Sequence, residues 1–307
     1  MVSSFEAFVA KRFPQSQIVS LSRTNNYVYL VTNDNESVVV KLLTDSDIPV
    51  SYLAEVSDVI ARRLPTQTVR EIYRDRSAGP FEVVITEYIN GVDLATVLES
   101  DAASPLDGAV LSSFLVDFLQ VMADVPPLSP GFGLYKRTAV TFNTHREFIE
   151  HYAHRYWSRS RPFFDNRVQR TVDQLIDGGF LGATIDDQPF RVVAIDANLK
   201  NFIRTSDGSF AVLNVPIVGL SSVAHAVAAI SVHLRHHRER DLFLDEVALR
   251  FPAVQLEFVP HFELWNMLGI LSFYADRHPD RPETWRNFAS PKPLRDDFVT
   301  HLEQHFI

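Results

Sequence analysis

The most informative stretch of this chain reads Arg191-Val-Val-Ala-Ile-Asp196-Ala-Asn-Leu-Lys-Asn201-Phe-Ile203, and Phe210-Ala-Val-Leu-Asn214-Val-Pro216 follows a turn later. Apolar runs flank a polar loop in which Asp196 and Asn201 stand five positions apart. The next apolar run ends at Asn214. Short apolar runs bounded by polar residues are typical of buried strands. We therefore expect strands around this loop, with Asp196, Asn201 and Asn214 close together near the strand ends.

The chain before about residue 90 has the pattern of a sheet with one helix. β-Branched and aromatic runs predict strands over 17–22, 27–32, 37–43 and 81–88. Apolar residues at helical spacing predict a helix over 50–64. Lys41 lies in the third strand and Glu55 on the helix. Taken alone, a lysine in such a strand is more often a solvated edge residue than a functional one.

Beyond Gly91 the pattern becomes helical. Apolar stripes at helical spacing run through 111–122 and 168–176. Further helices are predicted over 223–236, 242–251 and 259–274. We predict an α+β chain of two lobes, with residues 1–90 as a small β-rich lobe and residues 91–307 as a larger, mostly helical lobe.

Composition narrows the functional classes. The formal net charge of −9 argues against nonspecific nucleic-acid binding and favours cationic partners. No apolar run approaches the roughly 20 residues that a membrane span requires, and residues 1–10 lack a signal-like pattern. The chain has no cysteine, which excludes disulfides and thiolate sites. We expect a cytoplasmic protein with neither a nucleic-acid nor a membrane partner.

Several polar and aromatic residues have a structural and a functional interpretation. Asp196 can shape a turn through its own backbone hydrogen bonds, and Asn201 has the same ambiguity. A group of basic residues on a predicted helix is expected to form a solvated face more often than a metal site: His233, Arg235, His236, His237, Arg238 and Arg240. We expect most aromatic residues of the helical part to lie in the core and some to line a pocket. The residues concerned are Tyr152, Tyr156, Trp157, Trp265, Phe273 and Tyr274.

The order of these features resembles the aminoglycoside phosphotransferase and choline kinase family, which has the protein-kinase-like two-lobed fold. The resemblance runs from about Leu21 to about Ile230. Asn26-Tyr-Val-Tyr29-Leu-Val31 is similar to the strand after the family's phosphate loop, and Thr86-Glu87-Tyr88-Ile89-Asn90-Gly91 is similar to its hinge. The spacing of Asp196 and Asn201 is that of a kinase catalytic loop.

The resemblance implies ATP and Mg²⁺ as cofactors and gives each motif residue a role. Lys41 would contact phosphates and Glu55 would hold it in an ion pair. The backbone of Glu87 and Ile89 would meet adenine. Asp196 would be the catalytic base and Asn201 a magnesium ligand, and Asn214 stands where the family has its second metal carboxylate. The helix with Glu263, Trp265 and Asn266 would wall the acceptor site.

The sequence also departs from the family pattern. The family's His-Gly-Asp is Ala194-Ile195-Asp196 here, Lys200 replaces a glycine, and Ser22 and Arg23 replace twin glycines. Asn214 supplies an oxygen but no charge, and the chain has no Asp or Glu between Gly208 and Arg238. Since Mg²⁺ favours carboxylate oxygens, weak metal binding is expected.

Two functions therefore remain open. The favoured one is a degenerate kinase-like protein that binds a nucleotide, a small ligand or a protein partner with little or no phosphoryl transfer. The alternative is an active ATP-dependent kinase that phosphorylates a hydroxyl of a small molecule, cationic acceptors included.

Overall fold

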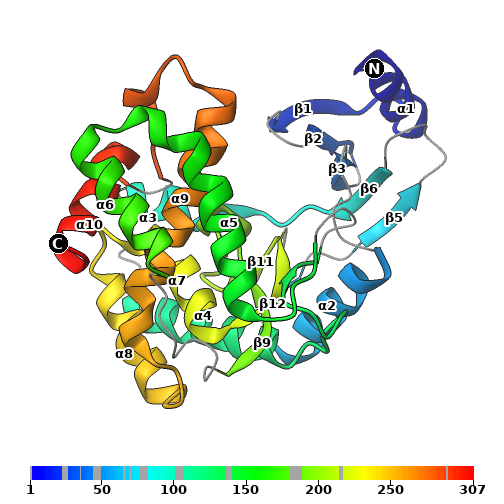
Figure 1. Cartoon of the computed structure of the whole chain (residues 1–307). Helices are drawn as coiled ribbons and strands as arrows, with labels where there is room; N and C mark the ends of the chain where they lie inside the picture. Colours follow the sequence, from blue (N-terminus) through cyan, green and yellow to red (C-terminus); the bar gives the residue numbers. More distant parts are fainter. Residues whose placement is uncertain are drawn as a thin grey trace.

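A β-sheet and the helices α1 and α2 form the N-terminal part of the chain, and helices dominate the rest (Figure 1). The computed structural model describes residues 2–22, 27–34, 36–43, 50–64, 67–68, 71–75, 82–100, 107–135, 140–179, 189–213, 217–287 and 290–307. Of the helices in these ranges, none combines the length and apolar character needed to cross a bilayer.

The N-terminal sheet has the strand order β1-β2-β3-β6-β5 and is antiparallel throughout. Its strands are β1 (Gln17–Ser22), β2 (Tyr27–Thr32), β3 (Ser37–Leu43), β5 (Glu71–Asp75) and β6 (Glu82–Glu87). The first three match the predicted strands. Side chains of β2, β3 and β6 form a small separate core with Val9 of α1 (Val2–Arg12). In this sheet Lys41 stands opposite Val28 and Val84.

The helix α2 (Val50–Arg63) packs with the helical part of the chain. Its apolar residues Tyr52, Val56 and Ile60, and Leu64 directly after it, belong to the main hydrophobic core. The Tyr52 hydroxyl donates to the carbonyl of Pro126 at 2.9 Å, and its ring meets Tyr135 edge-on. A division of the chain at residue 90 stays a prediction, because α2 precedes it yet shares the core of the larger part.

The helical part is built around α7 (Val223–Leu234), in which every residue is buried. It packs against α8 (Glu239–Arg250) and α9 (Val259–Arg277), while α9 also packs against α5 (His145–Ser160). Outer helices complete this part: α3 (Leu94–Glu99), α4 (Gly108–Ala123), α6 (Asn166–Asp177) and α10 (Leu294–His305). This arrangement leaves α5 on the side that faces the N-terminal sheet (Figure 1).

Two small sheets lie among the helices. One has the order β4-β11-β10-β7, with β4 (Gln67–Thr68), β7 (Gly91–Asp93), β10 (Phe202–Thr205) and β11 (Phe210–Val212). The other has the order β8-β12-β9, with β8 (Gly133–Leu134), β9 (Phe190–Ala194) and β12 (Val218–Ser222). These sheets carry the polar loop that was singled out from the sequence.

The expectation that the basic group around α7 and α8 forms a solvated face is wrong. His233 is buried, and Arg240 pairs at 2.9 Å with the fully buried Glu263 of α9. His236 lies 2.7 Å from Asp297 of α10. Acids on two later helices therefore draw these bases inward, which spacing along one helix does not reveal.

Candidate functional site

The loop that connects β9 to β10 brings Asp196 and Asn201 together. Asn201 Nδ2 donates to the backbone carbonyl of Asp196 at 3.2 Å. Asn198 accepts the backbone N–H of Lys200 at 2.9 Å and so begins the short 3₁₀ turn Leu199–Asn201. Asp196 itself is half-buried. The predicted strand, polar loop and strand are confirmed, and side-chain caps hold the loop in shape.

The next strand ends beside this loop. The N–H of Leu213, which follows β11, donates to the carbonyl of Asn201 at 2.7 Å. Asn214, the position on which the expected metal site depends, lies outside the described residues. Its proximity to Asp196 and Asn201 therefore stays a prediction, supported by the hydrogen bond one residue earlier.

Lys41 lies in the N-terminal sheet with a half-buried side chain. Burial lowers the pKa of its ammonium group from the ordinary 10.5. Among the ion pairs of the described residues, none joins Lys41 to Glu55, whose side chain is exposed. The ion pair that we expected is not formed in this structure, because α2 packs its apolar face into the main core.

The segment after β6 forms a short connection to β7. Glu87 ends β6 opposite Val38, and Ile89 is buried in a cluster with Ile203, Ala211 and Leu213. Gly91 allows β7 and β10 to lie close together, because a Cβ at this position would overlap the Arg204 carbonyl oxygen. A small, mostly buried apolar cluster thus lies between the predicted hinge and the strands of the Asp196 loop. The adenine contacts of Glu87 and Ile89 stay a prediction.

Aromatic residues of α5 adjoin the loop. Burial raises the pKa of Tyr156, and the nearby carboxylate of Asp196 contributes to the rise. Tyr152 and Trp265 are buried, as expected for core aromatics, whereas Tyr156 is half-buried. No sequence pattern connects Tyr156 with Asp196, although the spacing of four between Tyr152 and Tyr156 places both tyrosines on one helix face.

Among the described residues, the loop offers few donors for a magnesium ion. The loop offers one carboxylate, from Asp196, and one amide, from Asn201. Within the described ranges, no group of three or more His, Asp or Glu side chains is arranged to hold a metal ion. Two such oxygen donors supply little of the charge with which Mg²⁺ sites are usually built.

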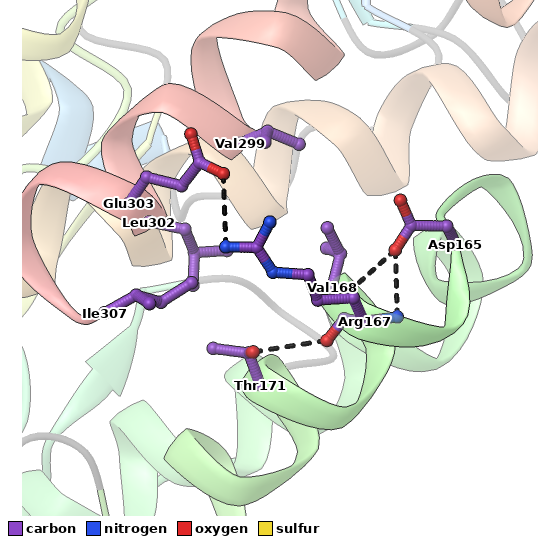
Figure 2. Close-up of a pocket in the computed structure, with 8 residues that line it drawn as sticks. All are labelled: Asp165, Arg167, Val168, Thr171, Val299, Leu302, Glu303 and Ile307. Carbon is purple, nitrogen blue, oxygen red and sulfur yellow. Dashed lines mark hydrogen bonds and ion pairs between the residues drawn. The ribbon is translucent and has the colours of Figure 1, made fainter.

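A shallow pocket between α6 and α10 lies elsewhere in the molecule (Figure 2). Arg167 reaches across it to Glu303 at 3.5 Å, and Val168, Val299 and Leu302 line it. None of the predicted site residues lines this pocket. It is therefore separate from the candidate site.

No family model and no curated protein sequence matches the chain. Solved structures do match along its whole length. The apo thermostable mutant of aminoglycoside phosphotransferase APH(4)-Ia has a TM-score of 0.68 at 15% identity, covering 98% of this chain and 96% of that one. Its ternary complex with ADP and hygromycin B gives 0.67 at 16% identity, with the same coverage.

A third similar structure is choline kinase LicA from Streptococcus pneumoniae, with a TM-score of 0.61 at 14% identity over 99% of both chains. Identities this low show a shared fold and do not by themselves transfer an activity. The chain has the protein-kinase-like fold found in aminoglycoside phosphotransferases and choline kinase.

Proposed function

We propose that this protein binds a nucleotide between its N-terminal sheet and the Asp196 loop, with little or no phosphoryl transfer. The observation that carries the proposal is Lys41. Its ammonium group is buried enough to lower its pKa, and no carboxylate among the described residues pairs with it. A partly desolvated cation is stabilised by a nearby anion. In kinase-like folds, the phosphates of the bound nucleotide lie beside the lysine of this strand.

The segment that follows Glu87 also offers groups that suit the base of a nucleotide. Ile89, Ile203 and Leu213 form an apolar cluster beside the segment that follows Glu87. A planar base can lie against the partly exposed Leu213 of this cluster while the backbone of the segment after Glu87 supplies hydrogen-bonding groups. Similar structures were solved with ADP and with GDP, which agrees with a nucleotide as the ligand.

Weak turnover follows from the sequence of the loop region. Phosphoryl transfer depends on positioning and on charge stabilisation. Compared with the family pattern, Asn214 stands where a charged metal ligand is usual and supplies only a neutral one. Lys200 and Ile195 each replace a glycine of the family's loop. Magnesium would be held weakly by such a donor set. A nucleotide can still bind through Lys41 and the apolar cluster, with a small molecule or a partner protein as a second ligand.

The alternative is an active small-molecule kinase. It is favoured by the loop geometry, in which Asp196 is half-buried and Asn201 is hydrogen-bonded to its carbonyl. In that case Asp196 would accept the proton of the acceptor hydroxyl.

The substitution Asn214→Asp separates the two functions. For the degenerate protein, wild type binds ATP with little dependence on magnesium, and Asn214→Asp strengthens magnesium-ATP binding. We expect a gain of roughly tenfold, since one added carboxylate beside a divalent cation is worth at least about 1.4 kcal/mol. Titration calorimetry with ATP, with and without MgCl₂, measures this gain.

The control variant is Asn166→Asp, which adds the same charge at an exposed position of α6. It is expected to leave magnesium-ATP binding unchanged. Phosphate transfer by wild type at ordinary kinase rates, roughly 1 to 100 per second, would establish the alternative. Undetectable ATP binding by both wild type and Asn214→Asp would exclude both functions.

A further inference from the structure

Charged side chains of four helices meet at the C-terminal half of α10. His301 of α10 and Glu263 of α9 are both fully buried there. Arg235, which directly follows α7, and Arg240 of α8 are half-buried beside them. These residues lie apart from the proposed nucleotide site, and the proposed function gives them no part.

The hydrogen bonds of His301 fix the position of its proton. Arg235 Nη1 lies 2.6 Å from His301 Nδ1, and an arginine can only donate. The carbonyl of Pro260 lies 2.7 Å from His301 Nε2 and can only accept. His301 is therefore a neutral imidazole that carries its proton on Nε2.

A second proton on His301 does not fit this arrangement. It would bind at Nδ1, where the Arg235 guanidinium already donates, and it would bring two cations into contact. Oε2 of Glu263 lies 3.7 Å from the same nitrogen and can accept that proton's hydrogen bond. A charged His301 would therefore bond to Glu263 and displace Arg235.

The charges around His301 oppose one another. Burial lowers the pKa of His301 to about 4, and the carboxylate of Glu263 acts against this shift. Arg235 lowers the pKa further, as does His305, whose ring centre lies 4.6 Å from that of His301. On its other side Glu263 pairs with Arg240 at 2.9 Å. The neutral ring is thus the form that this structure holds at neutral pH.

A second histidine holds α10 through a bond that acid does not break. His236 Nε2 lies 2.7 Å from Oδ1 of Asp297, which is buried near the start of α10. An ionised carboxylate can only accept, so Nε2 donates and a further proton would bind at Nδ1 of His236. Protonation keeps this hydrogen bond and adds an attraction between opposite charges. The bond that a proton would break lies in the C-terminal half of α10.

We propose that Arg235 and His301 form a proton-controlled latch for the C-terminal half of α10. In the closed latch, neutral His301 accepts from Arg235, which also donates to Gln304 of α10 at 3.1 Å. In the open latch, His301 carries a second proton and donates to Glu263, and Arg235 leaves both partners. Because a proton binds the open form more tightly than the closed one, acid shifts the protein toward the open form.

Nitrogen-15 NMR of the unliganded wild-type protein tests the closed latch at pH 7. We expect His301 to carry a proton on Nε2 and none on Nδ1. The signals of this ring are the ones that His301→Gln removes from the spectrum. A proton on Nδ1 at pH 7, with or without one on Nε2, overturns the proposal.

Hydrogen exchange tests the opening of the latch. After correction for the intrinsic rates, protection of residues 299–305 should fall roughly tenfold between pH 7 and pH 5, because the released ring binds a proton below the ordinary histidine pKa of 6.5. Residues 294–298, which His236 holds through Asp297, should lose less protection. Equal losses in the two halves of α10, or no loss in either, contradict the latch.

Variants identify the residues that act. The amide of His301→Gln can accept and donate without titrating, so this variant should lose the pH dependence, whereas His305→Gln, at the exposed neighbouring histidine, should keep it. Arg235→Met removes the donor without changing the buried ring and should lower protection of residues 299–305 already at pH 7. The proposal is overturned if His301→Gln keeps the pH dependence, if His305→Gln abolishes it, or if Arg235→Met leaves the protection unchanged.

Discussion

At the scale of single residues, Lys41 connects sequence, electrostatics and the proposed ligand. The strand pattern placed it in the N-terminal sheet, and burial lowers the pKa of its ammonium group. The sequence could not show that Glu55 would be unable to pair with Lys41. The orientation of Glu55 depends on which core the apolar side of α2 packs against. That side joins the main core, through Val56 and Ile60 among others.

Lysine acylation tests the state of Lys41. The chain has only five lysines, so peptide mass spectrometry can follow each one: Lys11, Lys41, Lys136, Lys200 and Lys292. We expect Lys41 to reach half of its maximal labelling rate at a pH below the ordinary lysine pKa of 10.5, since burial favours the neutral, reactive amine.

Bound phosphate would reverse this effect. In the proposed site, ATP would place negative charge beside Lys41, which would raise the pKa of this lysine and cover its amine. We therefore expect ATP to slow the labelling of Lys41 and not that of Lys292, which lies near the C-terminal end of the chain. Equal protection of both lysines, or labelling of Lys41 that ATP does not affect, contradicts the placement of phosphate at Lys41.

At the scale of elements, a buried chain of hydrogen bonds joins α5, β12 and α7. His145 Nε2 lies 2.7 Å from Ser221 Oγ, which lies 2.8 Å from His225 Nδ1. All three side chains are fully buried. Burial lowers the pKa of His145 to about 3 and lowers that of His225 as well, with the neighbouring ring adding to the second shift. Both rings are therefore neutral in the folded protein around neutral pH.

The buried histidines of this hydrogen-bonded group make the stability of the fold sensitive to acid. Below the ordinary histidine pKa of 6.5, the unfolded protein binds protons that folded His145 does not, so stability is fully present above 6.5 and falls as the pH drops toward 3. Each such histidine contributes a slope of at most about 1.4 kcal/mol per pH unit. We expect His145→Phe, which retains an aromatic ring beside Phe190, to have a shallower slope by about 1 kcal/mol per pH unit.

Urea denaturation from pH 7 to pH 5 measures the slope. Ser221→Ala is the matched control, because it removes the hydroxyl and retains both imidazoles; it should lower stability while keeping the wild-type slope. Identical slopes for wild type and His145→Phe would show that protonation of this ring does not contribute to acid unfolding.

Element boundaries show what local patterns could and could not predict. The helix expected over 223–236 ends at Leu234, and α8 begins at Glu239 rather than at 242. The acids Glu239 and Asp241 in the first turn of α8 are a signal that could have placed this start. The network of Ser231, Arg240 and Glu263 could not be foreseen, since it joins residues up to 32 positions apart on three helices.

At the scale of the whole molecule, the order of motifs predicted the kinase-like fold although the identity to similar structures is only 14 to 16% for those compared above. In the proposed nucleotide site, Lys41, the hinge segment and the Asp196 loop would each contact one nucleotide, which would account for their order along the chain. The packing of α2 was not predictable in this way. The apolar stripe of α2 could pack against the main core or against the small core of the N-terminal sheet. Which of the two it joins depends on the shape and area of the surfaces available, which the sequence of α2 does not reveal.

Hydrogen exchange tests where α2 belongs. Tyr52, Val56, Ile60 and Leu64 lie in the main core, whereas β2, β3 and β6 share a smaller one with α1. Because amide protection follows the cooperative unit to which a segment belongs, we expect α2 to exchange as slowly as α4 and more slowly than β2 and β3. Mass spectrometry of the unliganded protein at neutral pH measures these rates.

The outcome also bears on how Lys41 works. If α2 is protected together with α4, Glu55 stays with the helical part, and Lys41 in the sheet must find its negative partner in a ligand rather than in this helix. Equal amide exchange rates for α2 and β3 would contradict the packing described here. They would also mean that the ion pair between Lys41 and Glu55 can form in solution. Repeating the measurement with ATP then separates the two arrangements: phosphate bound at Lys41 should protect β3 and leave α2 unchanged.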